Sequence, residues 1–204
     1  MAQVSKKQFN QIKKLYNSGK SINCISQELG YTVNALTYFF RKNNLIRRNR
    51  TETNAIRFKN KQPSFNLKSR LTKKDELLKI VGIMLYWGEG SKWKGEKIVD
   101  FANSDPEMIK VFINFLRKIC GIDEKKIRIY LYCHEEREVQ KLKKYWSNLT
   151  NVSTEQFTKP YINTRYNPAK RGKMKHGLIH IRYYDKKLLD LLLNWIEKSK
   201  KQFV

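Results

Sequence analysis

The run from Leu77 to Lys92, L-L-K-I-V-G-I-M-L-Y-W-G-E-G-S-K, constrains the fold of this chain more than any other segment. It carries no charge from residue 80 to residue 88 and then ends on Gly88-Glu89-Gly90. The pattern predicts a helix packed inside a domain. Glycine lets another backbone approach closely, so that the Glu89 carboxylate would project from the end of a packed pair of helices. The alternative is a buried amphipathic helix capped by Gly90, with Glu89 merely solvated.

These residues resemble the signature helix of LAGLIDADG homing endonucleases. In that family, two such helices pack together at a dimer or pseudo-dimer interface, and their terminal acids hold divalent metal over DNA. With Glu89 at the metal-ligand position, Gly88 is the expected small residue before it, whereas Met84 stands where the family usually has glycine or alanine. The resemblance implies a dimer interface that includes Met84, Leu85 and Gly88.

The same resemblance implies a reaction. One signature helix per chain implies a homodimer on a near-palindromic site in double-stranded DNA. Glu89 would bind Mg²⁺, which activates water and neutralises charge at the scissile phosphate. Family members polarise the attacking water with basic residues, and the candidates here are Lys92, Lys94, Lys173 and Lys175.

The charge of the chain favours a polyanionic partner. There are 43 Lys and Arg against 18 Asp and Glu, a formal charge of +25 on 204 residues. Nucleic acid is the favoured partner because phosphate contacts release counterions. No uncharged run approaches the roughly 18 to 20 residues that span a bilayer, and the N-terminus lacks the apolar core of a signal peptide. The sequence therefore predicts no membrane span and a cytoplasmic, nucleoid-associated protein.

The cysteines and histidines do not predict a zinc site. The three cysteines are widely spaced and form no C-x-x-C pair, so reduced thiols are expected. His176 and His180 have the i, i+4 spacing of a zinc helix, but the residues from Leu178 alternate like a strand. Four extended residues span roughly 13 Å, which is too far for one metal ion.

The first 46 residues predict three short helices. Ser21 and Thr32 can cap the second and third helices, and Gly30 supplies the turn between them. Helix, glycine turn, helix is the spacing of a helix-turn-helix, and residues 1–46 resemble the trihelical DNA-binding domains of resolvases and transposases. A three-helix bundle that binds protein is the alternative. The residues of the third helix expected to contact DNA are Asn34, Thr37, Tyr38, Arg41 and Lys42.

Residues 47–74 combine many Lys and Arg with Pro63, several Asn and Ser, and only scattered apolar residues. This composition predicts a basic linker rather than a packed unit. We expect the linker to become ordered along the DNA backbone or in a minor groove, with Arg47, Arg48 and Arg50 among its contacts. The alternative is a solvated linker whose charge only aids solubility.

Residues 75–204 predict an α+β domain: helix, one or two strands, helix, strand, an inserted helix, one or two strands, helix. Apart from the inserted helix, this order resembles the αββαββα unit of LAGLIDADG proteins, whose helices cover one sheet face while the other face sits on the DNA. In the runs 127–132 and 178–184, aliphatic residues alternate with polar ones. Ordinary half-exposed strands are the alternative. The candidate DNA contacts are Arg128, Tyr130, Tyr132, His180, Arg182 and Tyr184, with Arg165, Lys170 and Arg171 from the basic segment before residue 178.

These patterns predict a sequence-specific DNA-binding protein that acts as a Mg²⁺-dependent homing-type endonuclease. A non-catalytic transcriptional regulator is the first alternative, since some regulators pair a degenerate LAGLIDADG domain with a helix-turn-helix. Such degenerate members tend to lose the terminal acid, which this chain keeps as Glu89. An RNA-binding maturase is the second alternative, because tyrosines on basic strands also suit stacking on unpaired bases.

Overall fold

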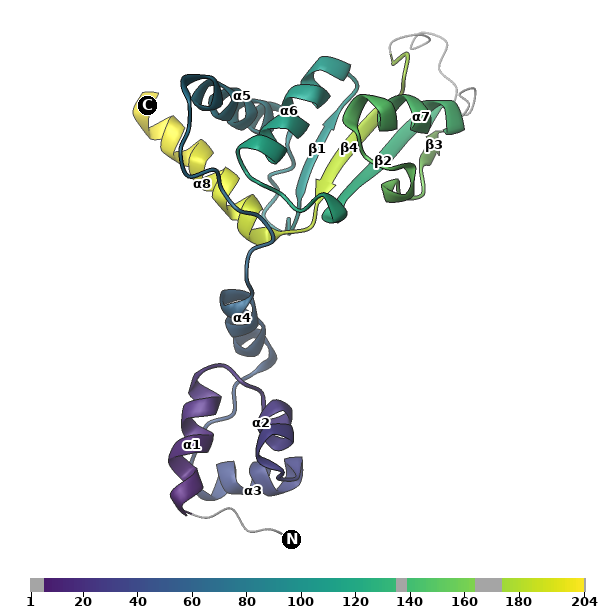
Figure 1. Cartoon of the computed structure of the whole chain (residues 1–204). Helices are drawn as coiled ribbons and strands as arrows, with labels where there is room; N and C mark the ends of the chain where they lie inside the picture. Colours follow the sequence, from purple (N-terminus) through teal and green to yellow (C-terminus); the bar gives the residue numbers. More distant parts are fainter. Residues whose placement is uncertain (1–5, 135–138, 164–173, 204) are drawn as a thin grey trace. The chain divides into compact units, whose positions relative to one another are not determined.

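A computed structural model of the chain describes residues 6–134, 139–163 and 174–203 (Figure 1). The fold class is α+β, as the sequence predicts. The chain divides into two compact units, Met1–Gln62 and Pro63–Val204.

The first unit is helical. Its described elements are α1 (Lys6–Asn17), α2 (Ile22–Leu29), α3 (Val33–Lys42) and α4 (Arg50–Asn60). The side chain of Ser21 accepts a hydrogen bond from the backbone N–H of Cys24, and that of Thr32 from Ala35, so both predicted caps are confirmed. Gly30 ends α2 in the left-handed region, with φ 71°, where a glycine is favoured.

Buried side chains from α1, α2 and α3 form one small core in this unit. Its members are Ile12, Ile22, Ile25, Leu36, Phe39 and Phe40. Tyr16 packs edge-on against Phe40, with ring centroids 4.6 Å apart. Burial of side chains of this size contributes about 1.5–3 kcal/mol each, so the unit has a genuine core despite its length.

Helix α4 lies where the sequence led us to expect irregular linker. Asn49 and Glu52 form a capping box, in which each side chain accepts a hydrogen bond from the other residue's backbone N–H. The helix has no buried residue, but Ile56 packs against the turn at Gly19, where an added Cβ would lie 2.2 Å from Ile56 Cγ2. The paired caps and one apolar contact therefore outweigh the polar composition of the segment.

The residues just before α5 also differ from a free linker, because they pack within the second unit. Phe65 forms a β-bridge with Ile122. The backbone N–H and the hydroxyl of Ser64 both donate to the Asp185 carboxylate, each at 2.7 Å. The second unit therefore begins at Pro63, twelve residues before the sequence-based boundary at residue 75.

The second unit is built on a four-stranded sheet in the order β1-β4-β2-β3. Strand β4 is antiparallel to β1 and β2, whereas β3 is parallel to β2 because helix α7 connects them. The α-helices and strands described in the second unit are α5 (Lys73–Glu89), β1 (Val99–Asn103), α6 (Pro106–Lys118), β2 (Ile127–His134), α7 (Val139–Thr150), β3 (Tyr161–Asn163), β4 (Leu178–Tyr183) and α8 (Lys186–Phe203).

This order matches the expected one, with one strand where one or two were expected between the first two helices. The chain after α5 does not form a full strand there, and it contributes only a bridge from Gly90 to Phe101 of β1. The αββαββα arrangement would place a hairpin at this point. The domain thus keeps the expected succession of helices and strands, with a single strand in place of that hairpin.

The four helices of the second unit share one core with one face of the sheet, and Figure 1 shows α6 and α7 lying over that face. Phe101 of β1 stacks on Phe112 of α6, with ring centroids 4.1 Å apart. Gly82 of α5 lies directly against Phe115 of α6. Among the described residues, no helix, α5 included, is long and apolar enough to span a membrane.

Candidate nucleic-acid interface and acidic helix tip

The sheet of the second unit has one face turned away from the core, which we call the open face. Along β2 and β4, buried aliphatic residues alternate with half-buried polar ones, as the sequence predicts. The charged and aromatic side chains of the open face include Asp100, Arg128, Tyr130, Tyr132, Tyr161, His180 and Arg182. A surface of tyrosine, histidine and arginine offers both stacking groups and phosphate contacts.

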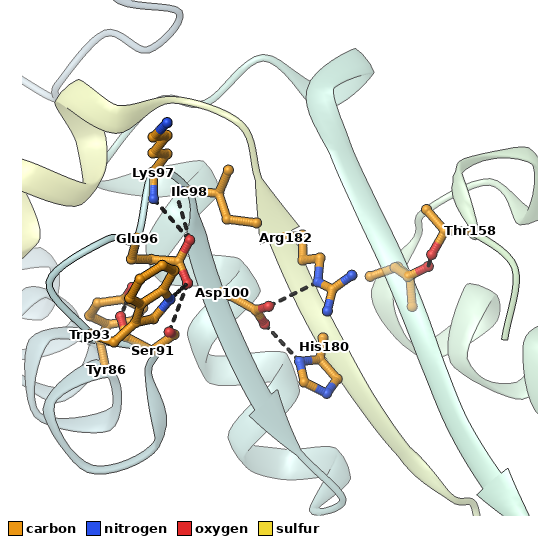
Figure 2. A network of polar contacts seen from close by, with 11 residues as sticks. Tyr86, Ser91, Trp93, Glu96, Lys97, Ile98, Asp100, Thr158, His180 and Arg182 are labelled. Carbon is orange, nitrogen blue, oxygen red and sulfur yellow. Dashed lines mark hydrogen bonds and ion pairs between the residues drawn. The ribbon is translucent and has the colours of Figure 1, made fainter. Parts of the chain in front are cut away.

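Asp100 of β1 is the centre of a polar network on the open face (Figure 2). One carboxylate oxygen lies 2.8 Å from His180 Nδ1, and the other accepts a hydrogen bond from Arg182 Nε at 2.9 Å. Burial raises the pKa of Asp100, but the hydrogen bonds and charges of His180 and Arg182 outweigh it, so that the pKa lies below its usual value. The carboxylate is therefore ionised and holds two candidate DNA contacts in place.

The two arginines of the open face are held by groups of the chain itself. The guanidinium of Arg182 also lies over the Tyr130 ring, 4.4 Å from its centroid. Arg128 Nη1 donates to the backbone carbonyls of Lys125 and Ile127, both at 2.7 Å. Because these contacts fix both side chains, the arginines are pre-placed on the surface rather than freely mobile cations.

At the β3 edge, the open face carries a stacked aromatic pair that the sequence analysis missed. Tyr161 stacks on Tyr132, with ring centroids 5.2 Å apart and the rings inclined by 13°. Asn163 Nδ2 donates to the Tyr132 hydroxyl at 2.8 Å. Tyr161 went unnoticed because the parallel pairing of β3 with β2 depends on α7, and no local pattern reveals it. Tyr184 is exposed just beyond β4.

The tip of α5 places Glu89 at the surface. Glu89 is exposed, whereas Gly90 beneath it is buried against the Tyr86 ring. The Tyr86 hydroxyl donates to the Ser91 carbonyl at 2.9 Å, and Lys92 Nζ donates to the Gly90 carbonyl at 2.7 Å. These bonds fix the backbone that follows the acid, and they hold the Lys92 ammonium at the carbonyl of the next residue, Gly90.

The loop that follows the tip is organised by Glu96 (Figure 2). Its carboxylate accepts hydrogen bonds from Ser91 Oγ, from Trp93 Nε1 and from the backbone N–H groups of Lys97 and Ile98. Burial raises the pKa of Glu96, but these bonds outweigh it and lower the pKa overall. Glu96 therefore has a structural role, and it holds the loop that carries the two candidate lysines after the tip.

The helix tip and the network around Asp100 are neighbours. Gly90 bridges Phe101, and the backbone N–H of Ser91 donates to the Asp100 carbonyl at 2.8 Å. Adjacent strands lie about 4.8 Å apart, so the backbone at the tip is one strand spacing from β1 and two from β4. The candidate acid thus lies next to the β1 edge of the sheet, and the candidate histidine lies on β4, the interior strand that pairs with β1.

Helix α5 also presents a row of exposed apolar side chains, which we call the exposed α5 face. Spacings of three, four and seven residues place them on one side of the helix. They are Leu77, Ile80, Val81, Met84 and Trp87. Gly88 is exposed too, with open space where a Cβ would be. Of the expected interface residues, Met84 and Gly88 belong to this region, whereas Leu85 packs against the core of its own domain, because it points to the flank of the helix.

In the first unit, α3 presents its expected surface. Asn34, Tyr38, Arg41 and Lys42 are exposed, and Thr37 is partly exposed. Polar and aromatic groups lie along the helix, and the two basic residues lie in its last turn. This distribution suits a helix that contacts base edges with one end and phosphates with the other.

Arg47 and Arg50 are exposed, as expected for DNA contacts. The Arg48 side chain instead packs within the first unit. Its guanidinium stacks over the Tyr16 ring, 3.9 Å from the centroid, and Nη2 donates to the Lys20 carbonyl at 2.7 Å. The backbone N–H of Arg48 donates to the Tyr16 hydroxyl. Arg48 therefore stabilises the first unit, since a planar cation gains more from an aromatic face and a carbonyl than from solvent.

The remaining candidate residues from the sequence are basic, and some of them lie outside the described part of the chain. Lys94 and Lys175 are exposed. Arg165, Lys170, Arg171 and Lys173 lie outside the described residues. Among the residues that the structure describes, no three His, Cys, Asp or Glu side chains gather into a metal site within one chain. Comparison with protein-family models, curated proteins and solved structures found no match for this chain.

Proposed function

We propose that this protein is a sequence-specific DNA-binding protein that cuts DNA as a Mg²⁺-dependent homodimeric endonuclease. The observation that carries the proposal is the exposed α5 face, which leads along the helix to the exposed acid Glu89. Soluble chains rarely leave a continuous row of large apolar side chains uncovered unless a partner covers it.

A second copy of the chain is the partner that fits this face best. Two α5 helices related by a twofold axis would bury the five apolar side chains of each copy against one another. These side chains are between 37% and 62% exposed, so covering the ten of them would contribute roughly half of the about 1.5–3 kcal/mol that full burial of each large side chain gives, set against the cost of association. The open space at Gly88 would allow close approach near the tips. The two Glu89 carboxylates would then lie near the axis.

A pair of Glu89 carboxylates suits Mg²⁺. This ion is usually held by one or two carboxylates, with water and substrate phosphates completing its ligands. Among the described residues of one chain, no three His, Cys, Asp or Glu side chains gather into a metal site, whereas a dimer would bring two Glu89 carboxylates together. When bound, Mg²⁺ would supply charge neutralisation at the phosphate. Lys92, whose ammonium is held at the Gly90 carbonyl, would add positive charge near the helix tip.

DNA binding is supported by surfaces on both units. The exposed side of α3 carries Tyr38, Arg41 and Lys42, and the open face carries pre-placed arginines and tyrosines. The formal charge of +25 supplies the general attraction to phosphate. The α3 surface would read base edges, while the open face would orient the duplex so that a scissile phosphate reaches the helix tips.

The test is cleavage of a randomised duplex DNA library, with and without Mg²⁺, by the wild type and by Glu89→Gln. We expect metal-dependent cutting at a near-palindromic sequence, lost at least about 100-fold in the variant while binding persists. Glu107→Gln, which changes an exposed acid of α6 in the same way, is the matched control and should cut normally.

Other outcomes would assign other functions. Selective retention of one DNA sequence without cutting, unchanged in Glu89→Gln, would make the protein a non-catalytic regulator. Tighter binding to structured RNA than to duplex DNA at the same salt concentration would favour the maturase alternative, in which the stacked pair Tyr132 and Tyr161 would contact unpaired bases.

A further inference from the structure

We propose that His180 accepts the proton of the attacking water during DNA cleavage, and that Asp100 and Arg182 position it for this role. The inference deepens the proposed endonuclease function and rests on it. It starts from the hydrogen-bonded network around Asp100 on the open face (Figure 2), in which His180 and Arg182 each contact one oxygen of the carboxylate.

The tautomer of His180 follows from its partner. The Asp100 carboxylate is ionised and can only accept, so the Nδ1 atom that lies 2.8 Å away must carry the proton. In the neutral ring, Nε2 then holds the free lone pair. A histidine fixed in this way is built to take up a proton at Nε2, and the resulting positive charge is stabilised by Asp100.

Groups from three strands hold the ring in place. Asp100 from β1 bonds Nδ1, and Tyr130 from β2 packs edge-on against the ring, with centroids 5.3 Å apart. Arg182 from β4 binds the second oxygen of Asp100 and keeps that carboxylate oriented. Ala102 on β1 pairs with His180 in the register of the sheet, so the residue opposite the imidazole has a small side chain. His180 nevertheless remains about one-quarter exposed.

The proposed step is hydrolysis. The water oxygen forms a bond to phosphorus while the bond from phosphorus to its leaving ester oxygen breaks, and the water proton passes to His180 Nε2. The leaving oxygen takes a proton from solvent. The imidazolium returns its proton to solvent after the products leave, which restores the starting state. A positioned proton acceptor of this kind typically contributes 10²–10⁴-fold to a rate.

A purely structural network makes a different prediction. In His180→Asn, the amide N–H takes the place of Nδ1–H and can still donate to Asp100, but no acceptor remains at the position of Nε2. If the network only stabilises the sheet, this variant should cut DNA as the wild type does. If His180 accepts the proton, the variant should fold and bind but cut slowly.

The experiment compares single-turnover cleavage by the wild type, His180→Asn and Asp100→Asn between pH 5 and 9, together with DNA affinity. We expect the wild-type rate to rise with pH and then level off. We expect His180→Asn to cut at least about 100-fold more slowly without that rise, while its affinity changes less than about threefold. Asp190→Asn, an exposed acid of α8, is the control for the acid-to-amide change.

A second measurement does not depend on cutting. Nitrogen-15 chemical shifts of the neutral ring should show Nδ1–H for His180 in the wild type and a shift toward Nε2–H in Asp100→Asn. Wild-type Nε2–H, or a His180→Asn enzyme that cuts at the wild-type rate, would overturn the proposal and leave the endonuclease standing. If the wild type cuts no DNA with Mg²⁺, both the endonuclease function and the role of His180 as proton acceptor are refuted. This result differs from those that refute the role of His180 alone.

Discussion

Gly82 of α5 lies against the ring of Phe115 in α6 so closely that a Cβ on the glycine would be 2.2 Å from Phe115 Cγ. Both residues are buried, and the ring is held among other aromatic side chains, at 5.8 Å from Phe112 and 6.4 Å from Trp195. The absence of a side chain at position 82 therefore sets how near α5 approaches α6. This contact fixes the side of α5 that faces its own domain.

The first prediction is that Gly82→Ala destabilises the second unit. The added methyl group must displace a packed ring, and overpacking of this kind costs about 1–3 kcal/mol. Gly88→Ala is the matched control, because Gly88 is exposed with open space around it and alanine favours a helix over glycine. Denaturant unfolding of both variants measures the difference, and equal stability of the two would contradict the packing argument.

The second prediction concerns the exposed α5 face. Met84→Glu should prevent formation of the proposed dimer, because a buried pair of like charges would replace two apolar side chains. Metal-dependent cutting should be lost with it. Met108→Glu is the control, since Met108 of α6 is 38% exposed against 37% for Met84. Analytical ultracentrifugation measures the association state, and a wild type that stays monomeric at high concentration would refute the dimer.

The third prediction separates two neighbouring arginines. Arg48→Ala should destabilise the first unit by about 1–3 kcal/mol, since it removes the stacking on Tyr16 and the bond to the Lys20 carbonyl. Arg47→Ala should leave stability unchanged, because Arg47 is exposed. Hydrogen exchange of the amides in α1–α3 of the full chain reports the change. Faster exchange in Arg47→Ala than in Arg48→Ala would show that the assignment is reversed.

The fourth prediction is an acid-dependent loss of stability. Burial raises the pKa of Asp185, but hydrogen bonds from Ser64, Lys187 and Leu188 outweigh it and lower the pKa below its ordinary value of 3.8. The contribution of the ionised Asp185 carboxylate to the free energy of unfolding is therefore fully present above its pKa in the unfolded chain. It is lost as the pH falls through the lower pKa of the folded protein. Asp185→Asn should be less stable at pH 7, by about 1–3 kcal/mol.

Thermal unfolding of the wild type and Asp185→Asn from pH 7 down to pH 2 measures this effect. The difference between the two should stay constant to about pH 4 and then shrink, because protonation weakens the wild-type contact as the substitution does. A difference that grows on acidification would contradict the assignment of the carboxylate.

Sequence periodicity predicted the helices and main strands well, because each has its own local signal. Ser21 and Thr32 cap helices as their residue types indicate, and the alternation around Tyr130 and His180 identified the open face. Local patterns could not predict α4 as part of a packed unit, since its contact with Gly19 joins residues far apart in the sequence.

The network around Asp100 was harder to find, because it depends on the order of strands. Asp100 and Arg182 face each other only because β1 pairs with β4, which is nearly eighty residues later in the chain. The signal that was present is a single acid between apolar residues in a basic sequence. An acid on a strand is stabilised when it faces an oppositely charged residue of the neighbouring strand. Asp100 could therefore have been matched with an arginine of the open face.

The order of the strands also has a consequence for synthesis. Strand β4 lies between β1 and β2, and it comes from the last thirty residues of the chain. On the ribosome, β1 and β2 therefore wait for their shared neighbour, while the first unit needs only its own 62 residues to fold. A nascent chain would therefore complete its first unit before the sheet of the second unit can form, so the two units would fold one after the other.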